Sequence, residues 1–223
     1  MIFAIRPQPG LQSTLQAARD LNMAVLGRPL FEVVPVAWDA PDASEFDALL
    51  LGSANAIRHG GAALEGLLTL PVHAVGEATA IAAREAGFTV AQTGVGGLQA
   101  LVDAADGDTH FLRLAGSEHV PLDLPDSAKV TTRIVYDVRA LPLSGSDEVS
   151  LRASDPLVLL HSAAAARHFA SECERRGLDK SRIALACIGP RVAQAAGSGW
   201  RDCQSAPQPD DAALLALARD MCH

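Results

Sequence analysis

The sequence predicts an α/β protein built from two similar domains, and three observations support this. Short apolar runs of β type alternate with Ala/Leu-rich stretches of helical period along all 223 residues. The apolar runs are rich in Leu and Val at successive positions, which is typical of parallel strands covered by helices on both faces. One strand–helix segment also recurs about half the chain later. With 49% hydrophobic residues, the chain can bury a substantial core.

These patterns predict nine strands and several helices. Pro209 and Asp210 mark the start of the last helix, and Leu214, Leu215 and Leu217 give it an apolar stripe. The strands are expected at Ile2–Ile5, Phe31–Val36, Ala48–Leu51, Val72–Val75, Thr89–Ala91, His110–Leu114, Thr131–Val138, Leu157–Leu160 and Ile183–Ile188, and the principal helices at Leu11–Leu26, Glu77–Ala86, Ala164–Arg176 and Asp211–Met221.

The recurring segment is a strand that ends in a serine, followed by a helix with an Arg-His pair. It occurs at 49–59 and again at 158–168. Each copy is followed by a strand that ends in a glycine and opens into an Ala-rich helix, at 73–80 and at 186–193. Two domains of one architecture explain this repetition, and chance similarity between common βα units is the alternative.

The β-branched segments around the first copy place the domain boundaries. We expect a discontinuous domain of residues 1–33 and 138–223, with residues 36–132 inserted as the second domain. The linkers, residues 31–36 and 131–138, would cross side by side as a two-stranded antiparallel ribbon. Pro35 is compatible with an edge strand there.

Composition excludes several classes of protein. A net charge of −8 argues against a nucleic-acid-binding protein. No apolar run approaches the roughly 18 residues of a membrane-spanning helix, and the N-terminus does not resemble a signal peptide, so we expect a cytoplasmic protein. No metal site is predicted, because the four cysteines form no CxxC pair and the histidine spacing does not fit. These cysteines, expected to be free thiols, are Cys173, Cys187, Cys203 and Cys222.

No cofactor is predicted either. The segment 94–97 departs from G-x-G-x-x-G, no lysine stands in a phosphate loop, and Ser53 lacks the glycines of a nucleophile elbow. What remains is four strand ends that lead into helices, at Ser53, Gly76, Ser162 and Gly189. The N–H groups at such helix starts favour carboxylates or phosphates, so the four together would suit a polyanion. The alternative is that Ser53 and Ser162 only cap their helices.

Taken in order, these motifs resemble the uroporphyrinogen-III synthase family over essentially the whole chain. The most specific of them is Val75-Gly76-Glu77-Ala78-Thr79-Ala80. The others are Arg6-Pro7 with Gly10 and Thr14, the Ser53 and Ser162 strand ends, Ile134-Val135-Tyr136, Ile188-Gly189-Pro190 and residues 209–214. The resemblance implies two α/β domains joined by a two-stranded β-ladder, in agreement with the repeat and the ribbon.

The resemblance also implies a reaction of the hydro-lyase class. Hydroxymethylbilane, a linear tetrapyrrole with eight carboxylates, is cyclised to uroporphyrinogen III with loss of water and inversion of ring D, on the way to haem, sirohaem, cobalamin or chlorophyll. The hydroxymethyl group ionises readily to an azafulvene, and unassisted closure gives the symmetric type I isomer. The enzyme therefore has to position the chain so that ring D closes through a spiro intermediate.

Site residues carried over by the resemblance fall into two groups. Tyr136 is expected as a general acid at the leaving hydroxyl, although it could equally be a half-buried aromatic of the ribbon. Thr79, at a family position that lines the cleft, is the second expected catalytic residue. Arg6 would either anchor a carboxylate or pair with an acidic neighbour. The expected substrate-binding residues are Arg6, Ser53, Ala54, Asn55, Gly76, Glu77, Gly116, Ser117, Ser162, Gly189 and Arg191.

Three positions depart from the family pattern. Ala54 replaces a proline, Asn55 replaces an arginine that many members have, and Arg191 stands where small hydroxyl residues are common. A monomer is expected, in transient contact with the enzyme that forms the bilane, and without nucleic acid or membrane partners. The competing hypothesis is an intracellular two-domain module that binds a small polyanion as a sensor, without catalysis.

Overall fold

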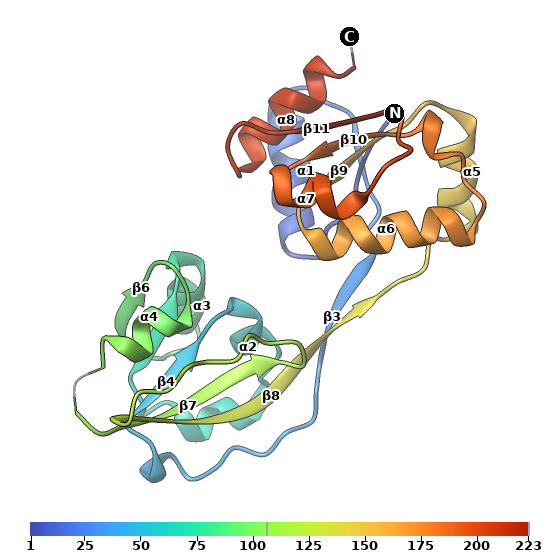
Figure 1. Cartoon of the computed structure of the whole chain (residues 1–223). Helices are drawn as coiled ribbons and strands as arrows, with labels where there is room; N and C mark the ends of the chain where they lie inside the picture. The colour runs from blue at the N-terminus through green and yellow to red at the C-terminus, as the bar shows by residue number, and fades with distance from the viewer. Residues whose placement is uncertain (106, 223) are drawn as a thin grey trace. The chain divides into compact units, whose positions relative to one another are not determined.

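The computed structural model describes residues 1–105 and 107–222, and it confirms the predicted α/β class (Figure 1). Two sheets are present, of five and six strands, and nearly all neighbouring strands within them are parallel. The chain divides into two compact units. Unit 1 comprises Met1–Glu32 and Arg139–His223, and unit 2 comprises Val33–Val138.

The sheet of unit 1 has the strand order β11-β10-β9-β1-β2. Its central strands are almost completely buried, as expected of a parallel sheet with helices on both faces. The first strand of the chain therefore lies in the interior of the sheet. The strands are β1 (Ile2–Ala4), β2 (Val25–Gly27), β9 (Leu157–Leu160), β10 (Ala184–Cys187) and β11 (Asp202–Ser205).

Alternate residues of these strands build two separate cores. Phe3, Val158 and Leu185 point to one face, where α5 (Gly145–Ala153), α6 (Ala163–Arg175) and α7 (Pro190–Ala196) contribute buried residues. The intervening residues point to the opposite face, against α1 (Gly10–Asp20) and α8 (Asp211–Asp220). Unit 1 thus has three layers.

Unit 2 repeats this plan with the strand order β3-β8-β7-β4-β5-β6. One face is covered by α2 (Ala54–His59), the 3-10 helix η2 (Gly61–Leu67) and α3 (Glu77–Glu85), and the other by α4 (Leu98–Asp103). A further short 3-10 turn, η1, spans Ala43–Glu45, and η3 of unit 1 spans Lys180–Arg182. The strands are β3 (Phe31–Pro35), β4 (Ala48–Leu51), β5 (Val72–Val75), β6 (Val90–Gly94), β7 (Thr109–Gly116) and β8 (Ala128–Ala140).

β3 and β8 form the ribbon through which the chain passes between the units. Val36 N–H donates to the Val135 carbonyl at 3.0 Å, and Leu141 N–H donates to the Leu30 carbonyl at 2.8 Å, so the two strands are antiparallel. β8 is longer than the predicted 131–138. Its extra N-terminal residues pair in parallel with β7, beginning at Thr109 opposite Ala128.

One predicted helix is wrong in its extent. The helix predicted at Leu11–Leu26 ends at Asp20, and Val25–Gly27 form β2 instead. Asn22 adopts φ 56°, the left-handed conformation that ends helices, and the β-branched Val25 then pairs with Ile2. The patterns also missed β11, α4 and α5, which are short elements with little periodicity.

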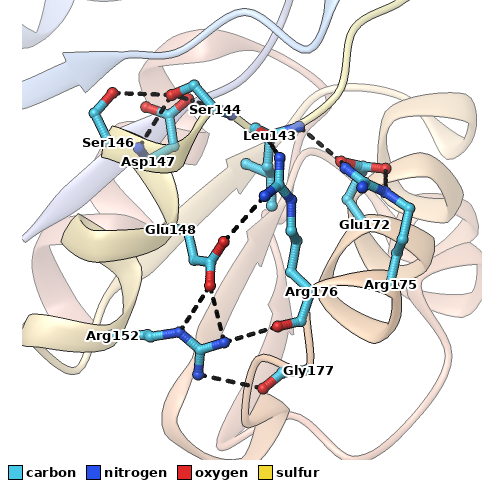
Figure 2. Close-up of polar contacts among 10 residues, drawn as sticks. All are labelled: Leu143, Ser144, Ser146, Asp147, Glu148, Arg152, Glu172, Arg175, Arg176 and Gly177. Carbon is cyan, nitrogen blue, oxygen red and sulfur yellow. Dashed lines mark hydrogen bonds and ion pairs between the residues drawn. The ribbon is translucent and has the colours of Figure 1, made fainter.

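A polar network ties the start of α5 to α6 in unit 1 (Figure 2). The Glu172 carboxylate accepts the Leu143 backbone N–H at 2.7 Å and two donors of Arg175 at 2.6 and 2.7 Å. Arg176 donates to the Leu143 carbonyl and pairs with Glu148. Both backbone groups of Leu143 are therefore satisfied by α6, which fixes the chain where it leaves the ribbon.

Glu172 is the key member of this network, because its side chain is only 8% exposed. The hydrogen bond from Arg175 lowers the pKa of Glu172 from 4.5 to about 2. We expect Glu172→Gln to reduce the free energy of unfolding by about 1–3 kcal/mol at pH 7, because a buried charge-assisted network is broken. Denaturant unfolding measures this difference.

The pH dependence has a definite sign. A carboxyl whose pKa is depressed in the folded state stabilises the protein above its unfolded pKa of about 4.5. This contribution is lost as the pH falls towards 2, so the gap between wild type and Glu172→Gln should close over that range. Glu174→Gln is the matched control, since the Glu174 side chain is 69% exposed. Equal stability of both variants at pH 7 would contradict the role of the network.

Candidate ligand-binding site in unit 2

A pocket of 450 Å³ opens in unit 2 where β4, β5 and β7 end. Because these strands are parallel, their carboxyl ends meet at one edge, and ligands of α/β sheets bind outside such edges. Its walls are more apolar than polar, with a small number of polar groups between them. The pocket is lined by Gly52, Ser53, Val75, Gly96–Gln99, Arg113–Gly116, Glu118–Leu122 and Tyr136.

Tyr136 lies over Gly116, and the register of the sheet explains why. Gly116 is opposite Tyr136 in the β7–β8 pairing, just after an irregularity in the register. A Cβ atom at Gly116 would lie 2.6 Å from Cε2 and 2.8 Å from Cζ of the tyrosine ring. A Cβ atom at Gly116 would therefore force the tyrosine ring to shift, so glycine at this position allows the ring to lie where it does.

Ser53 begins α2 and caps it. Its extended backbone, with φ −155° and ψ 140°, is typical of a capping residue, and its hydroxyl accepts the Asn55 N–H at 3.2 Å. Ser53 also lines the pocket. Ser53 therefore fits both predicted roles: its hydroxyl caps α2, and the residue lines the pocket.

The loop between β6 and α4 also lines the pocket, through Gly96 and Gly97. Gly96 and Gly97 have φ values of 99° and 111°, which glycine alone adopts easily. Val120, another lining residue, is 76% exposed. Of the segment 94–97, which fails as a dinucleotide motif, Gly96 and Gly97 line the pocket.

Arg113 is the charged residue buried at the pocket. It stands on β7 next to β4, opposite Leu50, and is only 6% exposed. Its Nη1 donates to the Val120 carbonyl at 3.0 Å, while its buried Nε has no hydrogen-bond partner. Burial lowers the pKa of Arg113, and the proximity of Tyr136 acts in the opposite direction. The cationic side chain is thus held in an apolar environment.

Unit 1 has its own polar cluster where β1 and β9 end. Asp211, the first residue of α8, accepts hydrogen bonds from Arg6 at 3.2 Å, Thr14 at 3.1 Å and His161 at 2.9 Å. The hydrogen bond from His161, with smaller effects from Arg6 and Thr14, lowers the pKa of Asp211. Arg6 therefore pairs with an acidic neighbour, the second of the two roles predicted for it.

The remaining predicted residues are not among the lining residues of the unit 2 pocket. Thr79 is buried in α3, and Glu77 pairs with Arg84 at 2.8 Å on the surface. Gly76 begins α3 with φ 76°, Ala54 is buried in α2, and Ser117 donates its N–H to the Tyr136 carbonyl. In unit 1, Ser162 caps α6 by accepting the Ala165 N–H, and Gly189 and Arg191 stand at the start of α7.

Sequence patterns missed Arg113, His161 and Asp211 as site candidates. The signal for Arg113 was available, because an arginine inside an otherwise apolar buried strand is rare. Asp211 directly follows the cap of α8, Asp210, which accepts the Ala213 N–H at 2.8 Å. The Asp211 cluster forms through contacts with Arg6, Thr14 and His161, which are far away in the sequence. Local sequence patterns do not predict such contacts.

The structure of residues 1–105 and 107–222 bears on two kinds of feature, the side-chain clusters of metal sites and the helices of membrane-spanning proteins. No three His, Cys, Asp or Glu side chains of these residues are grouped to bind a metal ion. None of the helices described there is both long and apolar enough to cross a bilayer. The four cysteines are free, and Cys187 and Cys203 face each other with their sulfur atoms 4.0 Å apart.

Comparison with known proteins agrees with the fold. A family model described as uroporphyrinogen-III synthase HemD matches residues 12–216. The uroporphyrinogen-III synthetase structure from Helicobacter pylori is 18% identical, with a TM-score of 0.68, covering 99% of this chain and 98% of that chain. A mutant uroporphyrinogen III synthase from Thermus thermophilus is 15% identical, with a TM-score of 0.53, covering 100% and 99%. No curated protein matches significantly.

The packing of Tyr136 on Gly116 is testable. We expect Gly116→Ala to cost about 1–3 kcal/mol of unfolding free energy, because the added methyl group overpacks against the ring. Tyr136 is the single tyrosine of the chain, so its ring resonances in NMR spectra report the displacement directly. Gly66→Ala is the control, since nothing lies within 4 Å of a Cβ there. Unchanged tyrosine resonances in Gly116→Ala would refute the contact.

Proposed function

The chain belongs to the uroporphyrinogen-III synthase family, and from this premise we propose that it cyclises hydroxymethylbilane to uroporphyrinogen III. The family model covers residues 12–216, and this match is the observation that carries the assignment. The reaction is a carbon–oxygen bond cleavage, in which water is lost and ring D is inverted. A sensor without catalysis, the competing hypothesis, has no comparable support.

This reaction depends more on how the protein positions the substrate than on reactive side chains. The hydroxymethyl carbon is attached to an electron-rich pyrrole, so its C–O bond breaks to give water and an azafulvene. The azafulvene carbon is then attacked by the substituted carbon of ring D, which gives a spiro intermediate that rearranges to the type III ring. A site that holds the chain for this attack suppresses direct closure to type I.

The unit 2 pocket supports this proposal. Its apolar walls suit pyrrole faces, and Val120, one of the lining residues, is largely exposed. The Tyr136 hydroxyl is the candidate proton donor to the leaving hydroxyl group, since its ring lines the pocket over Gly116. Ser53 adds a polar group to the same wall.

The proposal also covers the oligomeric state, the location and a partner of the enzyme. We expect a monomer in the cytoplasm, in transient contact with the enzyme that forms the bilane. The instability of the bilane favours such contact, because every free molecule closes unaided to the type I isomer. A short transfer path would therefore reduce the loss of substrate.

The activity itself is the first test. With freshly generated hydroxymethylbilane, and without added metal or nucleotide, the purified protein should form uroporphyrinogen III. The type I and type III products are separated by chromatography after oxidation. Formation of type I alone, at the rate of the protein-free control, would reject the assignment.

The second test concerns Tyr136. Tyr136→Phe should lower kcat about 100-fold or more, because the variant keeps the ring but loses the proton donor. Thr79→Ala should lower activity by a smaller factor through altered packing, while Ser53→Ala and Ser162→Ala should retain measurable activity, since each loses only a cap. A Tyr136→Phe enzyme with unchanged kcat would remove this hydroxyl from the mechanism.

A further inference from the structure

Among the described residues, Arg113 differs from the other buried charged side chains, because it forms no ion pair with a residue of opposite charge. Glu172 and Asp147, each less than 9% exposed, pair with Arg175 and Arg28 respectively. Arg113 is buried to a similar degree, yet no acidic side chain among the described residues forms an ion pair with it. Buried charges are normally paired, because desolvation makes an isolated one costly.

The guanidinium is also short of acceptors. Within the described chain the Val120 carbonyl is the one acceptor that it reaches, and Nε is left without a partner. A guanidinium carries five N–H donors in a planar fork, a geometry that matches the two oxygens of a carboxylate. Arg113 is one of the residues that line the pocket, while its unpartnered Nε is buried.

The other polar groups of the pocket lining do not pair with Arg113. Glu118 lines the pocket but is exposed to solvent, and Nδ1 of His119 hydrogen-bonds to the Gly116 carbonyl at 2.9 Å. Tyr136 contributes a hydroxyl, which can donate to a carboxylate as well. No group of this lining compensates the charge of Arg113.

We propose that Arg113 is a specificity-determining residue that binds one carboxylate of the tetrapyrrole in the unit 2 pocket, on the premise of the proposed function. The substrate carboxylate supplies the negative charge and the hydrogen-bond acceptors that the neighbouring protein groups do not provide to Arg113. An anchored carboxylate fixes the position of one pyrrole ring relative to Tyr136. Arg113 thus helps to determine which ring approaches the reacting carbon.

Arg113→Met is the decisive variant, because methionine fills similar space without charge. We expect KM for hydroxymethylbilane to rise about 10- to 100-fold, the value of a hydrogen-bonded ion pair to a ligand. The Kd for uroporphyrin III, the stable oxidised product with eight carboxylates, should rise equally in a fluorescence titration. The melting temperature should not fall, since an unpaired buried charge is removed. Arg113→Lys should recover part of the affinity.

Arg133→Met is the matched control, on the neighbouring strand β8 opposite Leu114 and outside the pocket lining. It removes the same charge from the same unit, and KM and Kd should stay within about twofold of wild type.

If Arg113→Met melts well below wild type and keeps its Kd, Arg113 only supports the Val120 loop and the inference is wrong. An unchanged KM and Kd with an intact fold would also overturn it. A wild-type protein that forms no type III product would instead reject the proposed function, whatever Arg113 binds.

Discussion

Parallel pairing of the central strands is the constraint from which the rest of the structure follows. Parallel strands need a crossover after each strand, so a helix or long loop leaves every carboxyl end at the same edge. In unit 2 this places the residues after β4, β5 and β7 next to one another. In unit 1 it brings Thr14, His161 and Asp211 together from three distant segments. Both polar clusters result from topology.

The two units use this common edge in different ways. In unit 1 the cation at the strand end, Arg6, is neutralised by Asp211 and held in a network with Thr14 and His161. In unit 2 the buried cation, Arg113, has no such acid among the described residues. Similar folds therefore present different charges at equivalent edges, so the repeated architecture does not imply repeated chemistry.

Sequence patterns predicted the fold class and the location of the principal strands, because buried parallel strands such as Leu157–Leu160 form continuous apolar runs. They failed at β2, where the Ala-rich pattern of α1 continues past Asp20 and only the conformation of Asn22 ends the helix. Of the site, Ser53, Gly116 and Tyr136 were predicted and line one pocket. Thr79 and Glu77 do not line it, since a motif fixes position along the chain but not the direction of each side chain.

The interior position of β1 has a consequence for how the protein is made. Ile2 pairs with Val25 on one side and with Leu157 on the other, so β1 cannot complete its pairing until the second half of the chain exists. At ribosomal rates of about 5–20 residues per second, this wait lasts roughly 10–30 s. Unit 2 is continuous in sequence and can fold during that interval. Until then β1 has only β2 as a partner, and its other edge stays unpaired on the nascent chain.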